Sequence, residues 1–235
     1  MYSNTVSFVR ARTLKTDKGR RARTGRVSGR RGLQIIPTVY QGLSGYNANK
    51  IGLTDHVTSY GEVTAAGIQV MSDKFRAVSP VSKFPAGQRI FYDLGCGIGT
   101  VVVGMAILNP EIQSRGIEIV PDRVRSAQTA LGKIRVKQIA DRITIRQGDI
   151  LSADYNYRDA AWMFLSNLCF NAATNADIAK RLEENCSTGC TLICSRELPF
   201  SPTSPFKQIE RGFTVPMTWS TTSTCILYKK VGVLI

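Results

Sequence analysis

Short apolar runs alternate along most of the sequence with segments whose apolar residues recur at helical spacing. Residues 59–77 carry a helical pattern that Pro80 ends, and an apolar run at 91–94 follows. Residues 100–108 then form an almost wholly apolar helix pattern. Further along, the pattern predicts a helix at 121–139, strands at 143–146, 161–165 and 191–195, a helix at 176–185, and β segments near 217–219 and 225–229. This alternation predicts an α/β fold with a doubly wound sheet closed by a β hairpin.

The most distinctive stretch is FYDLGCGIGTVVV at 91–103, which reads as a strand, a tight turn and the first turn of a helix. Glycine occupies every second position of the turn, at Gly95, Gly97 and Gly99. Glycine lets the backbone turn sharply and approach a ligand closely, because no Cβ is in the way. The helix that begins at Thr100 presents its free N–H groups at the same place. The stretch therefore predicts a nucleotide-type cofactor site at the carboxyl end of the first strand.

Acidic residues at the ends of three successive strands favour S-adenosylmethionine over NAD. Asp93 stands inside the glycine motif, where a carboxylate would repel a pyrophosphate but would suit the ammonium group of methionine. Glu118 follows 25 residues later and can accept both ribose hydroxyls. Asp149 can accept from the adenine amino group while Ile150 packs on the ring. A lone glycine-rich turn also occurs in ordinary α/β proteins, but the three acids in this order predict a class I S-adenosylmethionine-dependent methyltransferase with a Rossmann-like sheet.

Positive charge is concentrated near the N-terminus of a chain whose net charge is +14. Residues 10–31 contain ten Lys or Arg against one acid, Asp17, and hardly any large apolar residue. Such a segment favours binding to a polyanion, such as nucleosomal DNA or RNA, in a salt-dependent way. A mitochondrial presequence and a solubilising tail are the alternatives. The arginines expected to contact nucleic acid, whose clustering also suits nuclear import, are Arg20, Arg21, Arg23, Arg26, Arg30 and Arg31.

Composition divides the 235 residues into three parts. A disordered basic arm is expected over 1–31, a linker or irregular cap over 32–57, and the methyltransferase domain over 58–235. No apolar run approaches 18 residues, which predicts no membrane-spanning helix. The six cysteines lack the histidine or further cysteine that would complete a zinc set, so we expect reduced thiols and no metal.

The end of the fourth predicted strand carries information about the acceptor of the methyl group. It reads AWMFLSNLCFN, which places Ser166, Asn167 and Phe170 where they should face the transferred methyl. Asn167 begins the letters NLCF, which resemble the NLPY motif of the RNA adenine dimethylases but have Cys169 in place of the proline. An RNA adenine N6-methyltransferase is therefore the alternative function.

A second resemblance covers more of the chain, from about residue 57 to 230. Its motifs, in order, are YGE at 60–62, DLGCGIGTVV at 93–102, GIE at 116–118, GDI at 148–150, FLSNLCF at 164–170, ICSRELPFSP at 193–202 and MTWS at 217–220. In all of them, and in their order, the sequence is similar to the Disruptor-of-telomeric-silencing (Dot-one) family of histone lysine methyltransferases. That family would imply methylation of a histone H3 lysine in the nucleosome core, without a SET domain, and therefore action in the nucleus. A mitochondrial location, or the host nucleus for a viral source, is the alternative.

The resemblance also implies roles for individual residues. Tyr60 and Glu62 would close over the methionine part of the cofactor, and Trp219 would line the lysine channel. Three departures stand out: Ser166 replaces the first asparagine of the fourth-strand motif, Ile150 replaces a phenylalanine, and the threonine after YGE is displaced to Thr64. The expected cofactor-binding residues are Tyr60, Glu62, Thr64, Asp93, Gly95, Gly97, Thr100, Glu118, Asp149, Ile150, Ser166 and Asn167, and the expected catalytic ones are Tyr60, Asn167, Phe170 and Trp219.

Overall fold

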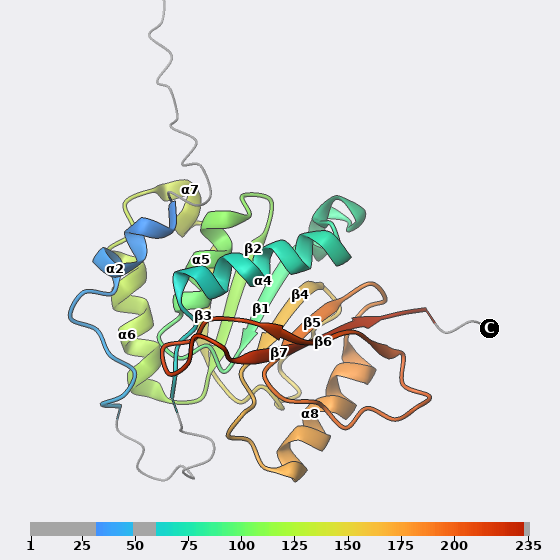
Figure 1. The fold of residues 1–235 in the computed structure, drawn as a ribbon. Helices are drawn as coiled ribbons and strands as arrows, with labels where there is room; N and C mark the ends of the chain where they lie inside the picture. Colours follow the sequence, from blue (N-terminus) through green and yellow to red (C-terminus); the bar gives the residue numbers. More distant parts are fainter. Residues whose placement is uncertain (1–31, 49–59, 233–235) are drawn as a thin grey trace, which may run out of the picture.

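A single mixed sheet of seven strands forms the centre of the described chain, which comprises residues 32–48 and 60–232 of the computed structural model (Figure 1). The strand order is β3-β2-β1-β4-β5-β7-β6; β1 to β5 are parallel, and β7 is antiparallel to both its neighbours. This order confirms the predicted doubly wound sheet with a closing hairpin. The strands are β1 Ile90–Leu94, β2 Gln113–Glu118, β3 Ile143–Gln147, β4 Ala160–Leu165, β5 Thr191–Cys194, β6 Phe206–Thr214 and β7 Thr224–Lys230.

Helices cover both faces of this sheet, and α8 lies on the opposite side from α4 (Figure 1). One core cluster packs α4, α5 and α6 against the sheet, and the other packs α8 against its second face. The helices are η1 Leu33–Ile35, α2 Ile36–Val39, α4 Ala65–Val78, η2 Val81–Lys83, η3 Ala86–Gln88, α5 Thr100–Leu108, α6 Pro121–Gly132, α7 Lys137–Ala140 and α8 Ala172–Asn185.

The central strand β1 shows how the sequence divides the core between the two faces. Phe91 belongs to the cluster under α4 and α5, whereas Tyr92 and Leu94 belong to the cluster under α8. All five residues of the strand are buried, as expected of a parallel strand with helices on both sides. Because β1, β2 and β4 run parallel, their carboxyl ends lie at one edge of the sheet, where Asp93 and Glu118 stand.

The first strand of the closing hairpin lies elsewhere than predicted. The prediction near 217–219 was wrong, since Met217 makes only isolated bridges to Val63 and Ser220. The strand is β6, which has exposed residues over most of its length and register shifts on either side of Glu210. These bulges interrupt the alternation of apolar and polar positions on which strand prediction depends.

Two helical segments also differ from the predicted pattern. The helix expected over 121–139 is divided, since α6 ends at Gly132 and α7 follows a short turn, while Ile134 and Ile139 still reach the core. Part of the segment expected to be linker or irregular cap is helical, and its η1 and α2 pack against α5. The expected basic arm, with its six arginines, lies outside the described residues.

Thr64 provides a test of how α4 is anchored. Its hydroxyl accepts a hydrogen bond from the backbone N–H of Gly67 at 3.2 Å, which caps the helix, and donates one to the Pro216 carbonyl at 3.0 Å. We expect Thr64→Ala to lower the free energy of unfolding by about 1 kcal/mol in urea denaturation, because both bonds are lost. Thr64→Ser keeps the hydroxyl and should retain most of the stability; equal losses in both variants would contradict this account.

Candidate functional site

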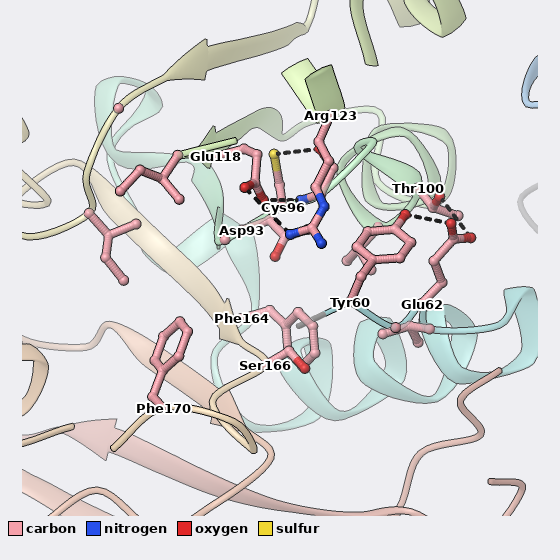
Figure 2. Close-up of a pocket in the computed structure, with 18 of the residues that line it drawn as sticks. Tyr60, Glu62, Asp93, Cys96, Thr100, Glu118, Arg123, Phe164, Ser166 and Phe170 are labelled. Atoms are coloured by element: carbon pink, nitrogen blue, oxygen red, sulfur yellow. Dashed lines mark hydrogen bonds and ion pairs between the residues drawn. The ribbon is translucent and has the colours of Figure 1, made fainter. Parts of the chain in front are cut away.

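The predicted cofactor residues meet in one cavity at the carboxyl ends of β1, β2 and β4 (Figure 2). Residues 60–63 form one wall, and the first turns of α5 and α6 contribute further lining residues. The cavity thus collects residues from segments that are far apart in the sequence. The predicted residues that line it are Tyr60, Glu62, Asp93, Gly95, Gly97, Thr100, Glu118, Asp149, Ile150, Ser166 and Phe170.

The floor of the cavity is the glycine-rich turn. Gly95, Gly97 and Gly99 have φ of 82°, 58° and 85°, the left-handed region that favours glycine. At two of these positions a side chain would also meet a neighbour: a Cβ on Gly97 would lie 2.5 Å from the Tyr60 ring, and a Cβ on Gly99 would lie 2.4 Å from Ile145 Cδ1. The backbone N–H of Gly97 donates to Glu118 Oε2 at 2.8 Å, so the turn on β1 is fixed to the end of β2.

Glu118 is the best-held carboxylate of the site and is 3% exposed. Its Oε2 accepts from Gly97, and its Oε1 accepts from the backbone N–H of Val120 at 2.9 Å. A carboxylate oxygen has two lone pairs, so after these bonds each oxygen can still accept a hydroxyl. This arrangement fits the two ribose hydroxyls of S-adenosylmethionine.

Asp93 lies buried beside Glu118, with 3% of its surface exposed. Burial raises the pKa of its carboxyl to about 8, and the nearby charge of Glu118 adds to the rise. A buried acid pair of this kind is stabilised when a cation comes close to it. The ammonium group of the cofactor is such a cation, so the donor set fits S-adenosylmethionine at this position as well.

The wall formed by residues 60–63 is fixed by a short polar chain. The Tyr60 hydroxyl donates to Glu62 Oε1 at 2.5 Å, and the Thr100 hydroxyl donates to Glu62 Oε2 at 3.5 Å. Burial, followed by the charge of Glu62, raises the pKa of Tyr60 far above its usual range. The outer side of the wall is held by Thr218, whose N–H donates to the Glu62 carbonyl at 2.8 Å. Glu62 thus joins the wall to the first turn of α5.

The predicted adenine end and methyl end lie on other strands. Asp149 stands at the exposed rim of the cavity, and its Oδ1 accepts from the N–H of Leu151 at 2.8 Å. Ile150 is partly buried beside it. At the end of β4, Ser166 and Phe170 line the cavity and face it in Figure 2. Both ends of the expected cofactor site therefore have residues in place.

Three predicted residues are not brought into this cavity. Asn167 is fully buried, and its amide donates to Asn175 and to the Arg196 carbonyl and accepts from the Arg196 N–H. The amide therefore ties the end of β4 to the end of β5 and to α8. Trp219 is 45% exposed and packs against Gly61 behind the wall. Thr64 caps α4.

Sequence reasoning missed Arg123, which lines the cavity from the first turn of α6. Its guanidinium lies 4.6 Å from the centre of the Tyr60 ring and 3.8 Å from Glu118 Oε1. A signal was available, because a cation in the first turn of a helix opposes the helix dipole and calls for a compensating partner. Glu118, five residues before Arg123, is that partner.

Other kinds of site find no support in the part of the chain that the structure describes. Within residues 32–48 and 60–232, no group of three or more His, Cys, Asp or Glu side chains could hold a metal ion. All six cysteines are free, and only Cys169 is exposed. Among the same residues, no helix has the length and apolar character needed to cross a membrane.

The raised pKa of Asp93 predicts a trade-off between stability and binding. The pKa of an aspartate in the unfolded chain is near 4, whereas the pKa of Asp93 in the folded chain is about 8. The free energy of unfolding therefore falls as the pH rises between these values, because the unfolded chain releases this proton first. We expect Asp93→Asn to be more heat-stable than the parent protein at pH 8 but not at pH 4, and to bind S-adenosylmethionine at least tenfold more weakly by calorimetry at pH 8. Asp141→Asn, at an exposed ion pair with Lys137, is the control. Melting curves that shift in parallel with pH would refute the assignment.

Neighbouring residues at the end of β4 should behave in opposite ways. Asn167→Ala leaves the buried Asn175 amide and the part-buried backbone of Arg196 without their partner, so we expect it to lower the free energy of unfolding by about 3 kcal/mol. Ser166→Ala should change stability by less than about 0.5 kcal/mol while altering the rate of methyl transfer. Denaturation and single-turnover assays measure the two effects. A stable but inactive Asn167→Ala protein would instead assign that amide to the chemistry.

Solved structures share the fold of this chain at low sequence identity. A methyltransferase from Geobacter sulfurreducens is 18% identical with a TM-score of 0.53, over 73% of this chain and 82% of that one. The glycopeptide N-methyltransferase MtfA is 13% identical with a TM-score of 0.52, over 71% and 90%. No curated protein sequence matches the chain. These likenesses show the class I methyltransferase fold.

The family is shown by the sequence itself. Residues 54–213 match the model of the family described as histone methylation protein DOT1. The match spans both the wall at 60–63 and the three strand-end acids. The chain is therefore an S-adenosylmethionine-dependent methyltransferase that belongs to the DOT1 family.

Proposed function

We propose that this methyltransferase modifies a lysine of histone H3 in the nucleosome core. The observation that carries the proposal is the family match over residues 54–213, together with a cavity that the Tyr60–Glu62 wall closes beside the glycine-rich turn. Asp93 would hold the ammonium of the cofactor, Glu118 its ribose and Asp149 its adenine. The bound cofactor supplies the methyl group as a sulfonium, and the chain supplies position and surroundings.

The residues around the methyl end suit an amine nucleophile. Phe164, Ser166 and Phe170 line this end, so it is mainly aromatic. A lysine ammonium must lose its proton before it can attack, which costs about 4 kcal/mol at neutral pH for an unperturbed side chain. Aromatic surroundings lower the pKa of the amine by desolvation and reduce that cost. In-line positioning of the amine nitrogen and the methyl group then provides most of the catalysis.

Tyr60 does not act as the base in this proposal. Its pKa is raised by burial and by Glu62, so the phenol keeps its proton at neutral pH. Its hydroxyl donates to Glu62 and leaves a lone pair on oxygen that can accept from an amine. We therefore assign Tyr60 the task of orienting groups in the cavity, with the lysine proton passing to solvent.

The basic arm supports a nucleosomal substrate through charge. Its six arginines, Arg20 to Arg31, lie outside the described residues, and we propose that they contact nucleosomal DNA and carry the protein to the nucleus. Contacts with phosphates release counterions, so each neutralised phosphate adds to the salt dependence of binding.

Trp219, exposed behind the wall, is proposed to face the histone surface rather than the cofactor.

A side-by-side transfer assay tests the substrate. Labelled S-adenosylmethionine is offered with reconstituted nucleosomes, free histones and total RNA, and we expect label on histone H3 in nucleosomes. Glu118→Gln, which weakens the ribose acceptor, is the inactive control. Label on RNA alone would refute the proposal and favour the adenine N6-methyltransferase.

The arm has its own test in nucleosome binding. Replacing the six arginines by glutamine should reduce the slope of log affinity against log salt by up to about five. Arg125→Gln and Lys137→Gln, at exposed positions of α6 and α7, provide a control for loss of charge elsewhere. An unchanged slope in the six-fold variant would leave the arm without a role in DNA contact.

A further inference from the structure

Arg123 is a buried cation in an unfavourable place. Only 2% of the residue is exposed, and it lies in the first turn of α6, where the helix dipole disfavours positive charge. Burial lowers the pKa of its guanidinium, although arginine remains charged at neutral pH. A buried charge at this position would destabilise the fold unless other interactions compensated for it. The contacts of the side chain show which segments compensate for this cost.

The guanidinium joins three separate segments at the cavity. Its Nε donates to the Gly45 carbonyl at 3.1 Å, and its Nη1 lies 3.8 Å from Glu118 Oε1. Its centre lies 4.6 Å from the middle of the Tyr60 ring, within the range of a cation–π interaction. Figure 2 shows the side chain reaching between Glu118 and Tyr60. One side chain thus touches the ribose acceptor, the wall and the segment before it.

Gly45 and Tyr46 also contact the Tyr60 ring. A Cβ on Gly45 would come within 2.2 Å of the Tyr60 ring, so the backbone there is in direct contact with the phenol. The Tyr46 ring meets the Tyr60 ring edge-on, with 4.9 Å between centroids, and a Cβ on Gly97 would lie 2.5 Å from Tyr60 Cε2. The Tyr60 ring is therefore in contact with both Gly45 and the glycine-rich turn. Any shift of residues 45–46 must move the ring that lines the cofactor cavity.

We propose that Arg123 is a positioning residue for cofactor binding and that Gly45 and Tyr46 belong to the cofactor site. Arg123 sets the orientation of Glu118 and Tyr60 together, and its bond to Gly45 keeps residues 45–46 against the ring. The role concerns S-adenosylmethionine alone and is independent of the methyl acceptor. It therefore stands or falls separately from the histone proposal.

The first test replaces the cation and measures cofactor binding directly. Arg123→Met keeps much of the bulk of the side chain and removes its charge and donors; we expect it to weaken binding of S-adenosylmethionine and S-adenosylhomocysteine by about tenfold or more in calorimetry. Arg123→Lys retains a cation and should recover part of the loss. Arg125→Met, on the exposed face of the same helix, should bind like the parent.

Kinetics separate positioning from a purely structural role. We expect Arg123→Met to raise KM for the cofactor about tenfold with kcat within about twofold, and to leave the melting temperature of the unliganded protein within a few degrees. A fall in melting temperature with unchanged affinity would overturn the proposal. So would equal binding by the Met and Lys variants.

A second variant tests the 45–46 contact without touching Arg123. Gly45→Ala places a methyl against the Tyr60 ring and should weaken cofactor binding by about tenfold. Gly87→Ala, where a Cβ meets nothing within 4 Å, is the matched control. Parent-like affinity in a folded Gly45→Ala protein would show that these residues lie outside the cofactor site.

Discussion

Two carboxylates buried side by side, Asp93 and Glu118, are the constraint around which the site is built. Burial disfavours the charged form of Asp93, and the nearby charge of Glu118 adds to that cost, so the pKa of Asp93 rises to about 8. The surrounding structure offsets it for Glu118 with two backbone N–H donors and a nearby guanidinium. The charge that remains is available to a ligand that brings an ammonium and hydroxyls. In our proposal, binding of the cofactor offsets the stability that is lost by burying this pair.

The cavity residues that follow from the residue pattern itself, Asp93, Glu118 and Asp149, stand at or just after the carboxyl ends of parallel strands, whereas Tyr60 and Glu62 come only from the family resemblance. A run such as FYDL defines a strand and its carboxyl end, and neighbouring parallel strands end at the same edge of a sheet. Asp93, Glu118 and Asp149 could therefore be placed together from spacing alone. The doubly wound sheet with its closing hairpin followed from the same alternation of strand and helix, and the structure confirms it.

The features that could not be predicted depend on which way a single side chain points and on contacts between residues that are distant in sequence. At the end of β4, Ser166 faces the cavity and Asn167 faces the interior, since adjacent residues of an extended chain point in opposite directions. A sequence motif does not specify which of the two neighbouring side chains points into the cavity. The bulged strand β6 loses the alternation that would reveal it. The contact of Gly45 with Tyr60 has no local pattern that would predict it.

The contact between residues 45–46 and Tyr60 links the cofactor cavity to a part of the chain before the family match, which begins at residue 54. Gly45 and Tyr46 press on Tyr60, and Leu33 and Ile36 pack into the same core as α5. The helices at 33–39 are thus fixed to the helix that follows the glycine turn, while residues 45–46 are fixed to the ring above that turn. Because these contacts form on folding, the conformational entropy of residues 33–46 is lost before the cofactor binds. In our proposal, weak contacts from residues 45–46 can then help to orient the cofactor without a further entropic cost.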